Sequence, residues 1–398
     1  MEGSKQRGAV SEKARLIENA RKLLPQLRAR AEKTNQARQI PPETINDYWD
    51  TNLFGILRPK RYGGLELRFD DFLEVAAEVG RGDGSAAWVY SVIVVHELMI
   101  SLYPEQLQSE IWKDQRAVIA SSFAPGSQPK KVDGGWQVSG KWSFCSGVDN
   151  AHWMILGGMF GMVGTPPHPD VRFMVLPISD CKIIDDWRVM GLQGTGSKSV
   201  VVENVFVPDY RIVSGEAMAT GQAPGGKVHS GNIYRAPTWA IFPFCLSSSA
   251  TGIARGAFEQ FCDAIKKRNA AFDMQAMANM QHIRMRISEA AALIDAAELL
   301  YRRSARETID KVEAGEPLSM EHRLRSRRDQ AYAVVMATKA MELLFKSSGG
   351  KGLYDNDPVQ RAYRDLHAMG AHIAVTWDLP AGSYGSVILG GPPTDFLF

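Results

Sequence analysis

Two histidines and several hydroxyl groups stand close to aromatic residues in this chain of 398 residues, and together they could carry out proton transfer. Trp88 and His96 are eight residues apart, so a helix would place them on one broad face about two turns apart. An imidazole exchanges protons near neutral pH, and an indole beside it would form an apolar wall. His372, with His367 five residues before it, is a second candidate of this kind.

Serines at the ends of two predicted strands add hydrogen-bonding groups to this set. Ser121 and Ser122 end one apolar run, and Ser146, followed by Gly147, ends another. A lone buried histidine or serine is more often structural than functional. Taken together, these groups predict an aromatic-lined pocket that offers a few polar contacts to a small ligand.

A glycine-rich run from Gly191 to Ser197 (GLQGTGS) is a further candidate site. It differs from the GxGxxG and Walker patterns of phosphate loops, and a strand rather than a helix is predicted to follow it. One interpretation is a tight β-hairpin connection. The other is that its amides and the hydroxyls of Thr195 and Ser197 bind a polar edge of a ligand.

Several kinds of chemistry and partner are excluded. The chain has no GxSxG nucleophile motif and no HExxH metal motif, and its four cysteines form no CxxC pair. We therefore expect no metal site and a reducing, cytoplasmic environment. Lysine and arginine (46) nearly balance aspartate and glutamate (44), which argues against a nucleic-acid partner.

No segment of the chain has the character of a membrane anchor. The first thirty residues are charged, and the most apolar stretches, 86–95 and 154–164, are shorter than the ~20 residues that a span requires. We expect neither a secretory signal nor a membrane partner.

The elements that must position these residues divide the chain into three parts and a connecting loop. Residues 1–115 are predicted to be helical, 116–212 to form a compact β domain, and 236–398 to form a helical bundle, with a Gly-rich loop and possible lid at 213–235. The expected strands are 117–123, 136–144, 153–160, 172–178 and 199–207. Because strands and helices do not alternate, the pattern predicts an α+β fold that is mostly helical.

Caps and apolar periodicity predict the helices. Ser11 should cap a helix that runs to residue 31, Pro42 should open the next, a third should cover 69–79, and Ser85 should cap the helix that carries Trp88. Apolar stripes at steps of three and four predict two long helices in the bundle. They consist of Ile283, Ile287, Ala290, Ile294, Ala297 and Tyr301, and of Val334, Thr338, Met341 and Phe345.

Several segments resemble the acyl-CoA dehydrogenase fold, and the likeness extends over nearly the whole chain. Residues 141–147 (KWSFCSG) are similar to the strand that lines the flavin in that fold, and 190–208 to its downstream hairpin. Residues 348–353 (SGGKGL) and 358–365 resemble the GGxGY and RxxRD elements. The resemblance implies an N-terminal helical domain, a middle β-barrel or sandwich domain and a C-terminal four-helix bundle.

Other details are similar to a separate branch of that fold. Many acyl-CoA dehydrogenases place a glutamate base shortly after the RD element, whereas here the stretch 371–374 (AHIA) holds no carboxylate. The run 191–197 is similar to GLRGTGS, with Gln193 in place of Arg, and 364–372 matches RDxHAxxxH. These patterns resemble the oxygenase components of two-component flavin-dependent monooxygenases, such as p-hydroxyphenylacetate hydroxylase and the hydroxylase of bacterial steroid-ring degradation.

The resemblance implies a reaction and roles for the candidate residues. A separate NAD(P)H-dependent reductase would supply reduced FMN or FAD, and a C4a-hydroperoxyflavin formed with O2 would hydroxylate a small aromatic substrate, for which a phenol is expected. Ser146 would sit near flavin N5, and His372 near C4a, where it would manage the peroxide proton. His96, with Ser122 beside it, would hold the phenolic oxygen, and Trp88 would wall the pocket.

Flavin anchoring is implied for residues in several parts of the chain. Arg268 would reach the flavin phosphate of a neighbouring subunit, Ser347 or Ser348 would add hydroxyls, and Arg235 would lie over the flavin. Ser146, Thr195 and Ser197 complete the expected cofactor-binding set. For each arginine, an ordinary surface salt bridge is the alternative. A flavin held across subunits implies an oligomer, and this family is typically homotetrameric.

Three alternatives stay open at this level. The same oxygenating intermediate could act on an indole or a sulfur-containing aromatic compound. The chain could be an acyl-CoA dehydrogenase or oxidase whose base lies elsewhere. It could also be a flavin-binding or scaffold protein that kept the fold without the chemistry.

Overall fold

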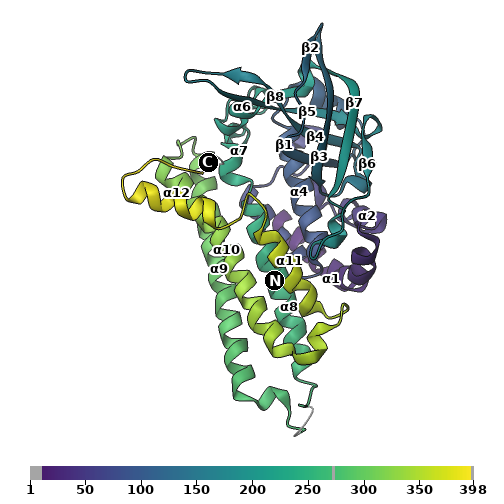
Figure 1. Cartoon of the computed structure of the whole chain (residues 1–398), viewed down its shortest axis with the longest axis vertical. Helices are drawn as coiled ribbons and strands as arrows, with labels where there is room; N and C mark the ends of the chain where they lie inside the picture. The colour runs from purple at the N-terminus through teal and green to yellow at the C-terminus, as the bar shows by residue number, and fades with distance from the viewer. Residues whose placement is uncertain (1–10, 271–273, 396–398) are drawn as a thin grey trace, which may run out of the picture.

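The computed structural model describes residues 11–270 and 274–395 of the chain. Helices of the first third pack beside two small sheets, and long helices of the last third form a bundle that extends away from them (Figure 1). Short 3-10 turns connect many of the elements. They include η1 (Phe54–Ile56), η2 (Lys60–Tyr62), η3 (Val148–Asn150), η4 (Ile178–Asp180), η6 (Asp209–Arg211), η9 (Met277–Asn279) and η10 (Gly349–Leu353).

The N-terminal helices are α1 (Glu12–Ala37), α2 (Pro42–Asp50), α3 (Phe69–Gly80), α4 (Gly84–Ile100) and α5 (Glu105–Ile111). The Ser11 side chain accepts a hydrogen bond from the Ala14 amide, as predicted for the cap of α1. That helix runs six residues beyond the predicted end and stops at Ala37, where Arg38 adopts a left-handed conformation.

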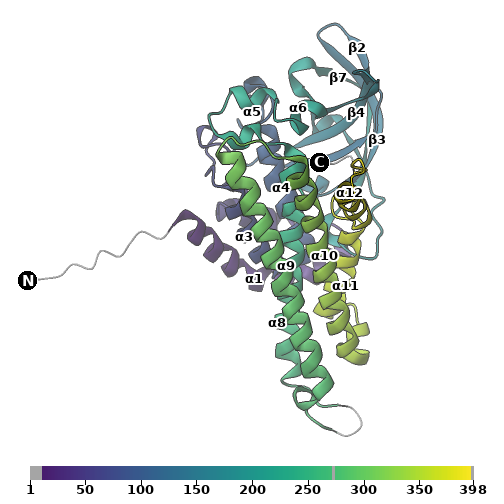
Figure 2. The same ribbon diagram turned by 90° about the vertical axis from the view of Figure 1, so that its left-hand side faces the viewer.

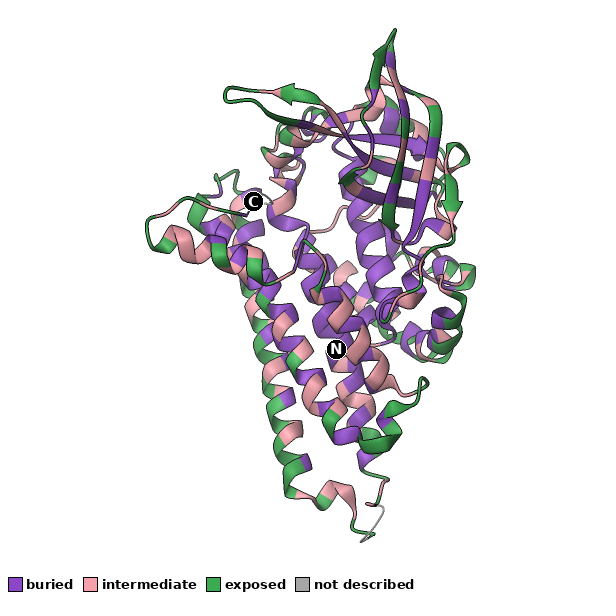
Figure 3. Cartoon of the chain, in the orientation of Figure 1, coloured by how far each residue is buried: buried purple, intermediate pink, exposed green. Residues whose placement is uncertain are grey.

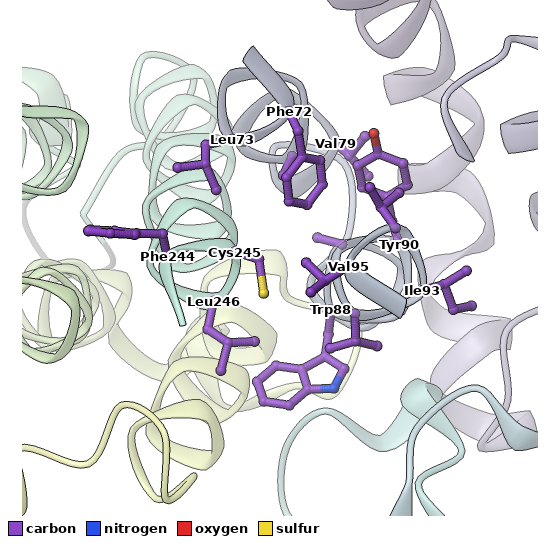
Figure 4. Close-up of a cluster of buried hydrophobic side chains, with 14 of the residues drawn as sticks. Phe72, Leu73, Val79, Trp88, Tyr90, Ile93, Val95, Phe244, Cys245 and Leu246 are labelled. Atoms are coloured by element: carbon purple, nitrogen blue, oxygen red, sulfur yellow. The ribbon is translucent and has the colours of Figure 1, made fainter. Parts of the chain in front are cut away.

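The helix that carries Trp88 and His96 differs from the prediction in its cap. Its cap is Asp83, whose carboxylate accepts from the Ala86 amide, and the predicted cap Ser85 is instead the second residue of the helix. All 17 residues of α4 are buried, because α3, α8 and β1 surround it. Figure 4 shows α4 beside α3 and α8, with the Trp88 indole pointing away from Tyr90. Because α4 is buried on every side, burial alone does not distinguish the face that carries Trp88 and His96 from the rest of the helix.

Two four-stranded sheets form the middle of the chain. Their orders are β1-β4-β5-β8 and β2-β3-β7-β6, and every pairing is antiparallel except that of β1 with β4. The inner faces share one apolar core that includes Trp142, Met154 and Val200. The strands are β1 (Ile119–Pro125), β2 (Lys130–Val132), β3 (Gly135–Cys145), β4 (Trp153–Val163), β5 (His168–Pro177), β6 (Lys182–Ile184), β7 (Lys198–Pro208) and β8 (Ile212–Ser214).

The last third of the chain forms the predicted bundle. Its helices are α8 (Phe244–Ile265), α9 (Gln281–Glu313), α10 (Met320–Ser348) and α11 (Pro358–Gly370), with α12 (Asp378–Ile388) across one end (Figure 2). Along the predicted α9 stripe, all members are buried except the half-buried Ile287. Buried residues follow the helix contacts while the helix ends and sheet tips are exposed (Figure 3). The predicted α+β class and acyl-CoA dehydrogenase-like layout are confirmed.

The segment 213–235, predicted as a loop and possible lid, contains helical turns. They are α6 (Gly215–Ala219), η7 (Pro224–Lys227) and η8 (Asn232–Arg235), followed by α7 (Thr238–Ile241). Met218 and Tyr234 are buried, so part of the segment is packed into the molecule. Movement of this segment as a lid stays a prediction, as do the domain boundaries at 115, 212 and 235. None of the helices in the described part of the chain combines the length and apolar character of a membrane span.

Candidate active site

Four of the predicted site residues form one chain of hydrogen bonds. Trp88 Nε1 donates to Ser146 Oγ over 2.9 Å, and Ser146 Oγ lies 2.8 Å from Ser197 Oγ. Ser197 Oγ lies 2.6 Å from Thr195 Oγ1, which donates to the Leu192 carbonyl over 2.8 Å. The chain joins α4, the end of β3 and the glycine-rich run, three segments that are distant in the sequence.

The run 191–197 is a clamped loop and not a tight hairpin. It contains the turn η5 (Gln193–Thr195) within the long connection from β6 to β7. A Cβ atom at Gly191 would lie 2.1 Å from the Arg364 carbonyl oxygen of α11, and one at Gly194 would lie 2.4 Å from Thr34 of α1. These glycines therefore permit close packing against two helices. Thr195 and Ser197 are 1 % and 5 % exposed, so they support Ser146 from behind.

His372 lies in the segment between α11 and α12, beside the Trp88 ring. The two ring centroids are 5.2 Å apart in an edge-on arrangement. The Ala374 amide donates to His372 Nδ1 over 3.2 Å, so in the neutral ring the hydrogen atom is on Nε2. Burial, and to a smaller extent the positive charge of Arg327, lowers the pKa of His372 to about 4. Near neutral pH this imidazole is an uncharged donor through Nε2.

A buried arginine holds the segment that carries His372. Arg327 donates to the Ala374 carbonyl and forms an ion pair of 3.1 Å with Asp395, and both side chains are fully buried. Because Ala374 orients the His372 ring, this pair links the C-terminal part of the described chain to the histidine.

His96 and its serine partner form a second polar group. His96 Nδ1 lies 2.7 Å from the Ile119 carbonyl, which can only accept, so Nδ1 carries the hydrogen atom and Nε2 accepts 2.8 Å from Ser121 Oγ. Burial lowers the pKa of His96 to about 4, although the bond to Ile119 acts in the opposite direction. The expected neighbour Ser122 instead donates to the Ser143 carbonyl over 2.8 Å. Adjacent strand residues point to opposite faces, so the predicted pairing with Ser122 is wrong.

An aromatic cavity of about 610 Å³ lies beside these groups. His372 lines it together with Phe123, Trp239 and Phe242, whose rings are 5.5 to 6.0 Å apart. Phe123 also lies 5.9 Å from the His96 ring, so this one side chain contacts both the cavity and the His96–Ser121 pair. The sequence reasoning missed these three aromatic residues. Their grouping depends on β1 meeting α7 and the start of α8, which no local pattern indicates.

The predicted phosphate-binding residues gather at another place in the bundle. Arg268 donates twice to the Ser348 carbonyl, at 3.2 Å, and Arg286 donates to Ser347 Oγ at 3.4 Å. Arg327, beside His372, and Ser348 are 21 residues apart on α10, which corresponds to about 30 Å along a helix. Within one chain the two groups are therefore well separated, and Arg286 is an addition that the sequence reasoning missed.

Two other residues singled out from the sequence are engaged locally. The Arg235 guanidinium donates to the carbonyls of His229, Ser230 and Gly231 in its own loop. The His367 ring lies 4.3 Å from that of Tyr363, and its Nε2 is 3.6 Å from Glu342. Neither residue is drawn into the polar groups described above.

The lowered pKa values of His96 and His372 predict a stability that falls in acid. A folded-state pKa of about 4 lies below that of an unfolded histidine, ~6.5, so the unfolded chain binds more protons between these values. Their contribution is fully present above pH ~6.5 and is lost as the pH falls towards 4. The free energy of unfolding, measured with denaturant at several pH values, should fall less steeply with decreasing pH in the His96→Gln/His372→Gln double variant than in the wild type. Substitution of the exposed His282 by Gln is the control, and an equal slope in the double variant would contradict the assignment.

Comparisons with known proteins agree with this geometry. The family model described as acyl-CoA dehydrogenase, N-terminal domain, matches residues 11–113, and that described as acyl-CoA dehydrogenase, C-terminal domain, matches 244–377. The crystal structure of 3-HSA hydroxylase from Rhodococcus sp. RHA1 superimposes with a TM-score of 0.90 at 35% identity, covering 96% of this chain and 99% of that one. Fold and site thus define a protein of the acyl-CoA dehydrogenase type.

Similar proteins of known activity narrow this class. The flavin-dependent monooxygenase oxygenase subunit HsaA of Rhodococcus jostii (strain RHA1) is 36% identical over 377 residues, which cover 94% of this chain and 98% of that protein. The oxygenase component of the FADH2-dependent resorcinol hydroxylase of Rhizobium sp. (strain MTP-10005) is 33% identical over 380 residues, 92% of each chain. This chain belongs to the family of oxygenase components of flavin-dependent monooxygenases. It uses reduced flavin and O2 to hydroxylate an aromatic compound, and a separate flavin reductase supplies the reduced flavin.

Proposed function

We propose that this monooxygenase hydroxylates a small phenol, and the observation that carries the proposal is the His96–Ser121 pair behind an aromatic cavity. His96 keeps 1 % of its surface exposed and Ser121 keeps 9 %, so a substrate would reach the serine first. The Ser121 hydroxyl donates to His96 Nε2, which leaves its oxygen free to accept from a phenolic O–H. Withdrawal of that proton raises the electron density of the ring carbon that receives oxygen.

The proton would move in two short transfers. The phenol would give its proton to Ser121 Oγ as the serine hydrogen passes to His96 Nε2, 2.8 Å away. The burial that lowers the pKa of His96 disfavours an isolated imidazolium, so the charge would form only as a pair with the phenolate. Phe123, Trp239 and Phe242 would hold the substrate ring and exclude water.

The residues present fit a bound reduced flavin. Ser146 accepts one hydrogen bond and donates one, which leaves one lone pair for a ligand N–H. His372 offers Nε2–H beside the cavity, next to the Trp88 ring. The flavin, when bound, supplies the electrons that activate O2. We assign Ser146 to the flavin edge at N5, Trp88 to the wall and His372 to holding a proton near the reacting oxygen.

The phosphate end of the flavin is assigned to a neighbouring subunit. Arg268 and Arg286 meet at Ser347–Ser348, and paired guanidinium groups suit a phosphate. That cluster is about 30 Å from Arg327, which holds the His372 segment, so one flavin could meet both only if they come from different chains. Exposed apolar residues near the cluster, Met285, Leu353 and Tyr354, fit burial by another subunit. A homotetramer is the expected assembly, and the unpaired cysteines fit a cytoplasmic location.

Rapid mixing tests the proposal. The protein is incubated anaerobically with photoreduced FMN or FAD, then mixed with O2 and one member of a substrate panel, and hydroxylated product and H2O2 are measured per O2 consumed. Phenols should give product in near-stoichiometric yield. Product from an indole or a thioether, with none from phenols, would overturn the phenol assignment, and reduction of bound oxidised flavin by an acyl-CoA would indicate a dehydrogenase.

A further inference from the structure

The hydroxyl groups of Ser146, Ser197 and Thr195 form a hydrogen-bonded chain that ends at the Leu192 carbonyl. The number of contacts in this hydroxyl chain equals the number of hydroxyl hydrogen atoms. The three oxygen–oxygen distances are 2.8 Å from Ser146 to Ser197, 2.6 Å from Ser197 to Thr195 and 2.8 Å from Thr195 to the Leu192 carbonyl. Distances of this size between oxygen atoms require a hydrogen atom in each contact. Three hydroxyl groups supply three hydrogen atoms, so none is spare.

The direction of every bond follows from the carbonyl at the end. The Leu192 carbonyl has no hydrogen atom, so the contact with Thr195 uses the hydrogen of Thr195. The contact between Thr195 and Ser197 must then use that of Ser197, and the next contact must use that of Ser146. Trp88 can only donate, so its N–H also points at Ser146 Oγ. Ser146 is left with one free lone pair and no free hydrogen.

We infer that Thr195 and Ser197 are positioning residues that make Ser146 an acceptor and so make this site select reduced over oxidised flavin. The inference rests on the proposed contact between Ser146 and flavin N5. Reduced flavin carries a hydrogen atom on N5 and donates to the free lone pair of Ser146. Oxidised flavin has only a lone pair on N5, so two acceptors face each other and that hydrogen bond is lost.

The surrounding structure holds the chain in this arrangement. Leu192, whose carbonyl ends the chain, also donates its amide to Asp365 Oδ1 over 2.6 Å. Asp365 is buried at the end of the RD element of α11, against which Gly191 packs. Turning the chain round would leave the contact between Thr195 and the Leu192 carbonyl without a hydrogen atom. The glycine-rich run and the RD element therefore act on the flavin through Ser146.

Equilibrium binding of the two redox forms tests the inference without a measurement of activity. Dissociation constants for oxidised FMN or FAD and, anaerobically, for the photoreduced form give a ratio for each variant. Ser197→Ala removes the acceptor of the Ser146 hydrogen, which can then turn to N5 of oxidised flavin. The ratio of the oxidised to the reduced dissociation constant should fall about tenfold, as expected for one hydrogen bond. Thr195→Val should lower the ratio in the same direction, and Thr195→Ser should keep it.

Two comparisons separate this role from a general effect on packing. Ser199→Ala is the matched control, because this buried serine on β7 donates to Ser143 Oγ over 3.0 Å, outside the chain. Its ratio should equal that of the wild type. Ser146→Ala should lower the ratio, and adding Ser197→Ala to it should have no further effect, since the two residues act as one unit.

The possible failures can be told apart. An unchanged ratio in Ser197→Ala and Thr195→Val, with flavin still bound, overturns the inference and leaves the proposed function standing. Additive effects of Ser146→Ala and Ser197→Ala would also overturn it. If neither redox form binds the wild-type protein, the proposed flavin contact itself is wrong. If Ser197→Ala does not fold, the pair Thr195→Val and Thr195→Ser decides the question.

Discussion

Replacing His372 by alanine is expected to lower the yield of hydroxylated product per O2 about a hundredfold, with H2O2 released in its place. The imidazole is neutral near pH 7 because burial lowers its pKa to about 4, and the Ala374 amide on Nδ1 leaves Nε2–H as its donor. Loss of that donor and of the ring that packs on Trp88 opens the wall of the site to water. Product, H2O2 and O2 are measured in single turnovers with reduced flavin.

A nearby histidine provides the control for this result. His367→Ala changes the same side chain five residues earlier, where the ring packs on Tyr363 and faces Glu342. It should change the product yield less than threefold, which is about 0.7 kcal/mol. Equal losses in the two variants would point to a general disturbance of α11. An unchanged yield in His372→Ala would remove this histidine from the site.

Replacing His96 by alanine is expected to slow hydroxylation of a phenol about a hundredfold to a thousandfold, while O2 still reacts with the reduced flavin. In the proposed mechanism His96 is the final acceptor of the phenolic proton, so its loss would leave the aromatic carbon less reactive without affecting the steps before it. Ser121→Ala should have a similar effect, because the proposed mechanism passes the proton from the substrate through the serine to His96 Nε2. The double variant should be no slower than the worse single variant.

Two comparisons separate a catalytic role of His96 from a structural one: phenols of different acidity, and substitution of the neighbouring Ser122. Phenols that are already ionised at the assay pH need no base, so they should lose less rate in His96→Ala than neutral phenols do. Ser122→Ala should lower the hydroxylation rate less than Ser121→Ala does, since Ser122 donates to the Ser143 carbonyl on the opposite face of β1. A larger loss in Ser122→Ala would restore the pairing expected from the sequence. Equal losses for all phenols would show that His96 only supports the fold.

The sequence was informative wherever a local repeat indicates which side of an element is buried. The steps of three and four from Ile283 to Tyr301 correctly predicted α9, and short apolar runs between turn-forming residues correctly located the long strands. The same reasoning predicted the helix α4 but could not show which of its residues meet a ligand, because all 17 of them are buried. A helix in the centre of a protein has no polar face, so its pattern contains no information on which residue meets a ligand.

By itself the sequence determined the types of residue available for chemistry, the order of the helical and strand segments, and a motif set sufficient to indicate the family. Only the tertiary structure decided that Ser121 and not Ser122 meets His96, and that Trp88, Ser146, Ser197 and Thr195 form one hydrogen-bonded chain. Secondary structure depends largely on neighbours within a few residues. These contacts depend instead on how α4, β3 and the clamped loop pack together, across more than 50 residues of sequence in two cases, Trp88 with Ser146 and Ser146 with Ser197. The direction of each bond then follows from a single carbonyl, that of Leu192, which can only accept.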